Sequence, residues 1–93
     1  MKETLQQMAD LAIAEATASN TKFGEYNSLH EAWAVLFEEV DELKDEMRKK
    51  QIEEPIEFYH PEMRSPTAIK KEAIQIAAVA LRIAQDAERM AMK

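Results

Sequence analysis

The sequence predicts an all-α fold of three to four helices, forming a single domain over residues 1–93 and completed by pairing with a second copy. Two observations predict the helices. The chain has 1 Gly and 3 Pro and is rich in strong helix formers, and its apolar residues recur at spacings of three and four. The partner is predicted by length, because a chain of 93 residues buries a small share of its surface alone.

The first two helices are separated by polar residues and a glycine. The first is expected from about Glu3 to Ser19, where Ser19-Asn20-Thr21 and then Gly24 interrupt the pattern. The second is expected from Ser28 to about Lys50, because Ser28 and Glu31 have the spacing of a capping box. Its apolar residues form one stripe, which predicts core packing for its members: Leu29, Trp33, Leu36, Phe37, Val40, Leu43 and Met47.

The last helix is the most apolar part of the chain. Residues Gln51 to Arg64 contain two prolines and no sustained period, so a connection with room for a short helical turn is expected there. Ser65-Pro66 is typical of a helix start, and the helix should continue to about Met90. It is apolar on most sides, which a few short helices cannot cover. This helix therefore predicts a dimer or a dimer of dimers.

Charge and composition exclude several classes of function. The net charge of −6 disfavours direct nucleic-acid binding, because an acidic surface repels phosphates. With 0 Cys there is no disulfide, zinc-thiolate site or thiol nucleophile. The chain has no apolar run of roughly 18 residues and no apolar signal core near its start. No membrane segment is predicted, and the cytoplasm is the expected location.

The second predicted helix carries six acidic residues within nine positions: Glu38, Glu39, Asp41, Glu42, Asp45 and Glu46. Of these, Glu39, Glu42 and Glu46 share one face, where like charges destabilise a helix. A solvated acidic face is the simplest interpretation. Ala32 and Val35 continue the same line of residues, however, which predicts that this face is partly covered.

A narrow polar stripe follows the last helix, made by Glu72, Gln75, Val79, Arg82 and Asp86. Carboxylate and amide oxygens suit hard divalent cations, and facing helices that present acid pairs form metal sites in bundles. The residues leave two alternatives open. Either the two helices hold a metal between them, or Arg82 makes a salt bridge with Glu39 or Glu42.

Two motifs on these helices resemble those of a known family. Glu38-Glu39-Val40-Asp41-Glu42 reads E-E-x-x-E, and Glu72-Ala73-Ile74-Gln75 reads E-x-x-Q. From about Ser28 to Asp86 the chain is similar to the MazG-like, all-α nucleoside triphosphate pyrophosphohydrolases, whose signature is E-E-x-x-E followed by E-x-x-D. The resemblance implies a MazG-like helical bundle that hydrolyses a (d)NTP to the (d)NMP and pyrophosphate. It also implies Mg²⁺, with Mn²⁺ able to substitute, at four positions: Glu39, Glu42, Glu72 and Gln75.

Gln75 departs from the family pattern, because a neutral amide stands where the family has a carboxylate. The loss of one negative charge weakens the expected metal site and favours a rival function, a non-catalytic helical dimer that keeps the fold as a binding or regulatory module. A third alternative is an acidic mimic of nucleic acid.

The remaining candidates concern water activation and the nucleotide. Glu38 is expected to orient or deprotonate the attacking water. Arg82 and Lys71 are candidates for contacts with phosphate. Trp33 and His30 are weaker nucleotide-binding candidates, because the apolar stripe favours core packing of Trp33 and His30 lies in the first turn of a helix, where a local hydrogen bond is expected.

Overall fold

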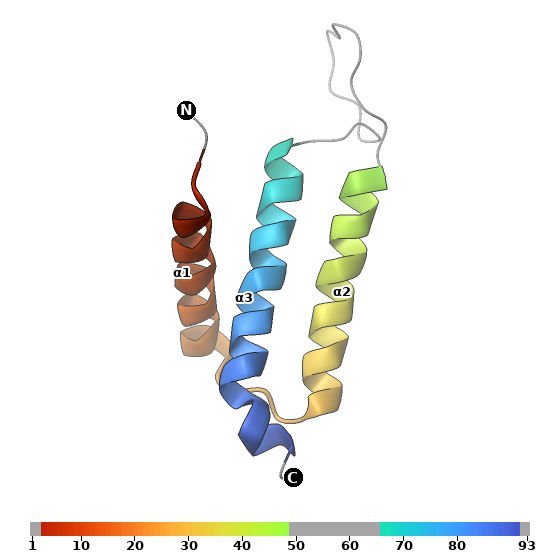
Figure 1. The fold of residues 1–93 in the computed structure, drawn as a ribbon. Helices are drawn as coiled ribbons and strands as arrows, with labels where there is room; N and C mark the ends of the chain where they lie inside the picture. Colours follow the sequence, from red (N-terminus) through yellow and green to blue (C-terminus); the bar gives the residue numbers. More distant parts are fainter. Residues whose placement is uncertain (1–2, 49–65, 92–93) are drawn as a thin grey trace, which may run out of the picture.

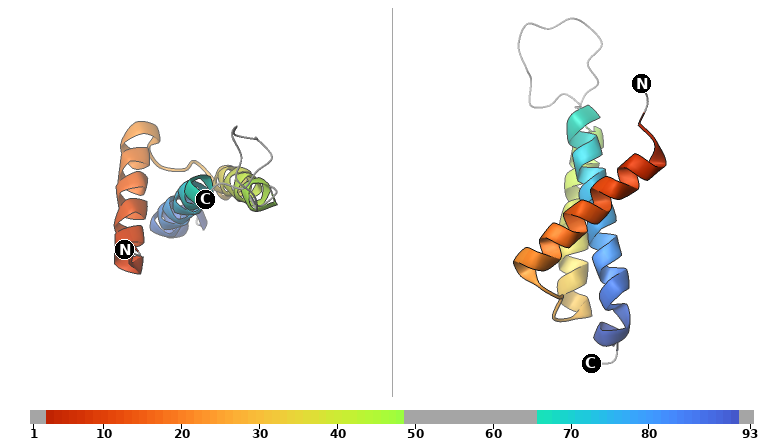
Figure 2. Two further views of the ribbon diagram at one scale, coloured as in Figure 1. Left: turned by 90° about the horizontal axis from the view of Figure 1, so that it is seen from above. Right: turned by 90° about the vertical axis from the view of Figure 1, so that its left-hand side faces the viewer.

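The computed structural model describes residues 3–48 and 66–91. These residues form three α-helices and no strand: α1 (Leu5–Phe23), α2 (Leu29–Arg48) and α3 (Pro66–Ala91). The all-α prediction is confirmed. The helix α3 lies between the other two and runs antiparallel to α2 (Figure 1), and α1 crosses α3 obliquely (Figure 2). Within the described ranges, no helix combines the length and the apolar character needed to cross a membrane.

The helices begin close to the predicted positions, with α1 starting at Leu5, two residues after the predicted Glu3. At the start of α1, the Thr4 hydroxyl accepts a hydrogen bond from the Gln7 N–H at 3.1 Å, and the Gln7 side chain accepts one from the Thr4 N–H at 2.7 Å. At the start of α2, the Ser28 hydroxyl accepts from the Glu31 N–H at 3.1 Å. Of the capping box predicted at Ser28, the structure gives this bond to the Ser28 hydroxyl, while the Glu31 carboxylate accepts from the Asn27 side chain at 3.0 Å. Pro66 is the first residue of α3, as expected for a proline at a helix start. The predicted connection, residues 51–64, lies outside the described residues.

The end of α1 corrects one prediction. The helix does not stop at Ser19-Asn20-Thr21 but continues to Phe23. The Thr21 hydroxyl donates to the Thr17 carbonyl at 3.1 Å, so this polar residue is accommodated inside the helix. Gly24 ends the helix with a φ of 74°, a backbone conformation that favours glycine.

The face of α2 that packs on α3 includes only one edge of its apolar stripe, where Leu36 is half-buried against the core and Leu43 is half-buried. Ala32 is buried, and Val35 is half-buried against the core. Trp33 and Phe37, by contrast, are 59% and 57% exposed. The prediction of core packing for Trp33 is therefore wrong within a single chain. The face that carries Ala32, Val35 and the acidic residues Glu39, Glu42 and Glu46 is turned towards α3 instead. The sequence had predicted that this face is partly covered.

A buried polar network fixes the α1–α2 connection to α3. The guanidinium of Arg82 donates to the Asn20 side chain at 3.0 Å, to the Tyr26 hydroxyl at 3.2 Å and to the Gly24 carbonyl at 2.8 Å. It also lies 4.4 Å from the centre of the Tyr26 ring. The Asp86 carboxylate accepts from the Tyr26 N–H at 3.2 Å. The polar stripe of α3 is thus partly buried, and these two side chains find partners there.

Candidate metal centre

Three carboxylates from two helices converge between α2 and α3. Glu39 and Glu42 lie one turn apart on α2, and Glu72 faces them from the first half of α3. One oxygen of each carboxylate lies within 4.8 Å of the others. The ligands of a hard cation lie about 2.0–2.6 Å from it, so oxygens on its opposite sides are about 4–5 Å apart. We refer to these three residues as the carboxylate cluster, and its spacing is compatible with a single divalent ion.

The burial of the carboxylate cluster favours a bound cation. Glu39 and Glu72 are half-buried, whereas Glu42 is exposed. The Oε2 atom of Glu72 is buried, and within the described part of the chain it has no hydrogen-bond partner. An unsatisfied buried acceptor lowers the free energy of unfolding by about 1–3 kcal/mol. A cation at the cluster would satisfy this oxygen, and carboxylates are the ligands that Mg²⁺ prefers.

The proximity of the carboxylates changes their acidity. A hydrogen bond with Glu72 is the main reason why the pKa of Glu42 is raised, and loss of hydration and the charge of Glu72 add to it. Burial raises the pKa of Glu39, as does the charge of Glu42, whereas a hydrogen bond with Glu72 lowers it in part. The net effect on Glu39 is a raised pKa. Without a cation, Glu39 and Glu42 therefore keep their protons to a higher pH than isolated carboxyl groups do, because their pKa values are raised.

We expect the metal-free protein to become less stable as the pH rises through the cluster's titration. The pKa values of Glu39 and Glu42 are raised above 4.5 in the folded state, so the native chain binds more protons than the unfolded chain between 4.5 and those raised values. The free energy of unfolding should fall across this window. Urea denaturation in the presence of a chelator, between pH 4 and pH 7, measures it.

The matched variants for this test lie on the same helix. Glu42→Gln should flatten the fall in stability, because it removes one of the coupled carboxylates. Asp45→Asn should leave the fall unchanged, because Asp45 is exposed and outside the cluster. Equal pH profiles for the wild type and Glu42→Gln would contradict the assignment.

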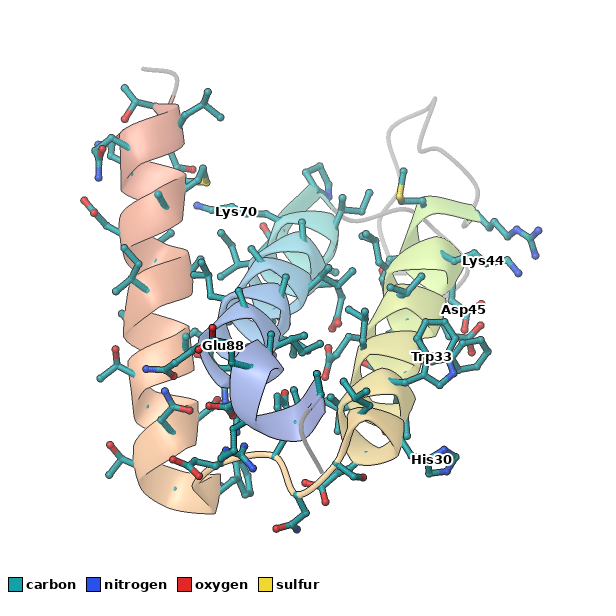
Figure 3. The ribbon with its side chains drawn as sticks, turned by 60° about the horizontal axis from the view of Figure 1, so that its bottom comes forward. His30, Trp33, Lys44, Asp45, Lys70 and Glu88 are labelled. Atoms are coloured by element: carbon teal, nitrogen blue, oxygen red, sulfur yellow. The ribbon has the colours of Figure 1, made fainter. Side chains whose placement is uncertain are left out.

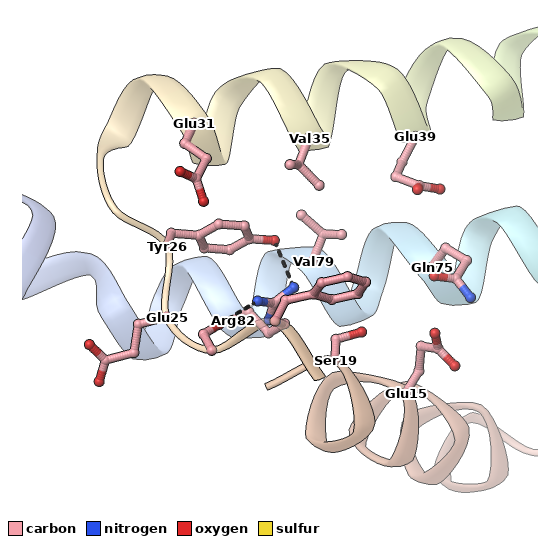
Figure 4. A pocket seen from close by; sticks show the side chains of 12 residues that line it. Glu15, Ser19, Glu25, Tyr26, Glu31, Val35, Glu39, Gln75, Val79 and Arg82 are labelled. Carbon is pink, nitrogen blue, oxygen red and sulfur yellow. Dashed lines mark hydrogen bonds between the residues drawn. The ribbon is translucent and has the colours of Figure 1, made fainter. Parts of the chain in front are cut away.

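A pocket of about 360 Å³ adjoins the carboxylate cluster and is bordered by all three helices. Figure 4 shows Glu15 of α1, Glu39 of α2 and Gln75 of α3 at one end of it, and Tyr26 and Arg82 towards the other end. Small-molecule sites occupy about 300–1,000 Å³. The pocket therefore has room for one small ligand whose end reaches the carboxylates.

The structure brings the acidic candidates together. Glu39, Glu42 and Glu72 form the cluster, and Gln75 lines the adjoining pocket together with Glu39. Glu38 is exposed beside them, and its negative charge contributes to raising the pKa values of Glu39 and Glu42. The predicted metal ligands and the predicted water-activating residue therefore occupy one region of the molecule.

The candidates for substrate contacts are more dispersed. Arg82 lines the pocket, but its guanidinium binds the α1–α2 connection, and it makes no ion pair with Glu39 or Glu42, both of which the structure describes. Lys71 is exposed on α3, where it lines a shallow depression near Gln75.

Trp33 and His30 lie on the outer side of α2, away from α3 (Figure 3). Neither residue lines the pocket beside Glu39. The structure does not bring these two residues to the carboxylate cluster.

Glu15 is a candidate site residue that the sequence did not indicate. It lines the pocket with Glu39, and its charge contributes to raising the pKa of Glu39. Its position is set by the neighbouring small residues Ala12 and Ala16, which are buried. The sequence shows Glu15 only as an acid on the small-residue face of α1, which does not place it at a pocket.

No family model matches the chain, and no curated protein or solved structure matches it. The likeness to the MazG-like hydrolases therefore rests on the two acidic motifs.

Proposed function

We propose that this protein is a magnesium-dependent nucleotide pyrophosphohydrolase, which hydrolyses a (d)NTP to the (d)NMP and pyrophosphate. The observation that carries the proposal is the convergence of Glu39, Glu42 and Glu72 beside a pocket of about 360 Å³. A nucleotide fits this combination, because its nucleoside can occupy a pocket while its triphosphate needs cations to approach an acidic protein of net charge −6.

The resemblance of the two motifs to the MazG-like family adds support. Under this proposal, the three helices belong to a MazG-like bundle. The E-E-x-x-E motif lies on α2 and the E-x-x-Q motif on α3, and these two helices contact each other. Residues about thirty positions apart in the sequence thus contribute to one cluster, as a shared metal site requires.

The residues of the cluster and its neighbours would bind the metal, activate water and contact the phosphates. Glu39, Glu42 and Glu72 would hold the metal, and the Gln75 amide would supply a neutral oxygen or orient one of the carboxylates. When bound, the ion supplies charge stabilisation at phosphorus and makes water a better nucleophile. Glu38, exposed beside the cluster, accepts the proton of the attacking water. Lys71, one residue before Glu72, contacts the phosphates from the solvent side.

The products of hydrolysis test this function directly. Incubation of the chain with a panel of NTPs and dNTPs and Mg²⁺ or Mn²⁺ should release monophosphate and pyrophosphate in equal amounts, and EDTA should stop the reaction. Phosphorus NMR resolves the two products from orthophosphate. Release of orthophosphate with a diphosphate would indicate another hydrolase, and the absence of any product with all substrates and both metals would contradict the proposal.

The alternative is a non-catalytic helical module with a weakened metal site. Two observations favour it: Gln75 replaces a charged ligand, and Arg82 is bound to the α1–α2 connection. Such a module would show a metal-dependent or nucleotide-dependent rise in melting temperature without turnover. Differential scanning calorimetry and the product assay on the same sample therefore separate the two functions.

A further inference from the structure

The outer side of α2 exposes large apolar side chains in a regular line. The residues recur every three to seven positions, and we call them the outer stripe: Leu29 (54% exposed), Trp33 (59%), Phe37 (57%), Val40 (44%) and Met47 (53%). The rings of Trp33 and Phe37 contact each other, with centres 5.8 Å apart. Figure 3 shows Trp33 on the side of α2 that points away from α3. Within residues 3–48 and 66–91, no other helix covers these large apolar side chains of α2.

The buried core within the described residues contains few large apolar side chains. Its buried cluster is made of Tyr26, Ala32, Val79 and Met90, and no side chain in the described ranges is less than 2% exposed. Large apolar and aromatic side chains are normally highly buried, whereas α2 buries Ala32 and leaves Trp33 exposed. Within the described residues, the large apolar side chains of α2 therefore lack the cover that a hydrophobic core would give them.

The area of the outer stripe is sufficient for a protein–protein contact. Aromatic side chains present about 150–250 Å² each and aliphatic ones less. Since the five residues are roughly half exposed, together they offer on the order of 400 Å². The largest apolar patch on a typical monomer is about 300–600 Å², and a standard interface buries about 800 Å² on each partner. The outer stripe alone would supply about half of that area.

We propose that the outer stripe is the contact surface between two copies of this chain, which pack antiparallel through their α2 helices. Lys44 follows Val40 by one turn and interrupts the outer stripe with a positive charge. A parallel pair would bring the two Lys44 ammonium groups together. An antiparallel pair that crosses near Phe37 and Val40 places each Lys44 beside the partner's Trp33, where an ammonium group and an aromatic face attract each other. Such a pair is related by a two-fold axis and closes on itself.

This contact differs from the one that the sequence predicted, which was based on the apolar faces of the last helix. It also leaves the carboxylate cluster open, because Glu39 lies on the α3 side of α2 and the outer stripe lies on another side. The proposal therefore does not depend on the proposed enzymatic function.

The oligomeric state tests the proposal. Light scattering should give about twice the chain mass of 10.7 kDa for the wild type. Phe37→Lys should weaken association by about a hundredfold or more, because each substitution occurs twice across a two-fold interface. Ile13→Lys is the matched control, since Ile13 is 53% exposed on α1, and this variant should remain a dimer. A wild-type monomer at all concentrations, or dissociation by Ile13→Lys with Phe37→Lys still dimeric, would overturn the proposal.

Two further measurements keep the test valid if Phe37→Lys fails to fold. Trp33 is the sole tryptophan, so its fluorescence in the wild type should be protected from acrylamide and lose that protection on dilution. Protection that persists in a monomer would mean that another segment of the same chain covers the outer stripe, which contradicts the proposal. Since the chain has 0 Cys, Leu29→Cys and Met47→Cys proteins can be mixed and oxidised. Disulfides between the two variants support antiparallel packing, and disulfides within each variant alone overturn it.

Discussion

Glu72→Gln is expected to abolish the rise in melting temperature that Mg²⁺ or Mn²⁺ produces in the wild type, and to reduce nucleotide hydrolysis by at least about a hundredfold. The reason is that Glu72 is the one member of the carboxylate cluster that α3 contributes, so the two α2 carboxylates would lose the ligand opposite them. The metal-free variant should be as stable as the wild type or more stable by roughly 1 kcal/mol, because a neutral amide removes like-charge repulsion. Calorimetry with and without Mn²⁺, and the product assay, measure both effects.

Two further variants serve as controls, one with no expected effect and one with the opposite effect. Asp45→Asn removes an exposed charge from α2 outside the cluster and should leave the metal response unchanged. Gln75→Glu adds the carboxylate that the family pattern contains and should tighten metal binding and increase hydrolysis, because Gln75 lies beside Glu39 at the pocket. If the wild type shows no metal-dependent shift at millimolar Mn²⁺ and Glu72→Gln behaves identically, the acidic residues are solvated faces and the enzyme proposal fails.

The helices could be predicted because the signals that define them are local. Capping residues and apolar periods act over a few positions, so Ser28 and Pro66 located the starts of α2 and α3 correctly. The end of α1 could not be located in the same way. Asn20 and Thr21 are poor helix formers, but the tertiary hydrogen bond from Arg82 to Asn20 and the local one from Thr21 to Thr17 keep them helical.

Which face of α2 packs on α3 was not predictable from periodicity. An apolar stripe shows that a face is to be buried, but it does not distinguish burial in the same chain from burial against another copy. Here α3 packs on the side with Ala32 and Val35, where small residues allow the helices to approach. Trp33 and Phe37 are left on the other side.

The candidate site was predictable where it lies on one helix or in one motif. Glu39 and Glu42 are one turn apart, and the motif likeness connected them to Glu72, which the structure places beside them. Glu15 and Tyr26 were not predictable, because they reach the pocket through the crossing of α1 and the path of the α1–α2 connection. Long-range positions of this kind depend on the packing of the whole chain.

Arg82 provides the second large effect, and it concerns stability more than catalysis. The side chain is 6% exposed, and it holds the end of α1 through one hydrogen bond and the α1–α2 connection through two more and the face of Tyr26. Arg82→Met should lower the free energy of unfolding by about 3 kcal/mol, because it leaves buried acceptors unsatisfied. Arg82→Lys should recover part of this loss, since one ammonium group cannot reach all three acceptors. Urea denaturation measures both variants.

The same variants decide between the two roles assigned to Arg82. If Arg82 acts by holding the connection, then Arg82→Lys should change the free energy of unfolding while the KM for the nucleotide stays within about threefold of the wild type. Lys71→Met is the matched control, because Lys71 is exposed and its loss should raise KM without a change in stability. A large rise in KM for Arg82→Lys, with unchanged stability, would show instead that the guanidinium contacts the triphosphate. We expect the first outcome, because the acceptors that Arg82 satisfies come from α1 and from the connection, and the carboxylate cluster supplies none of them.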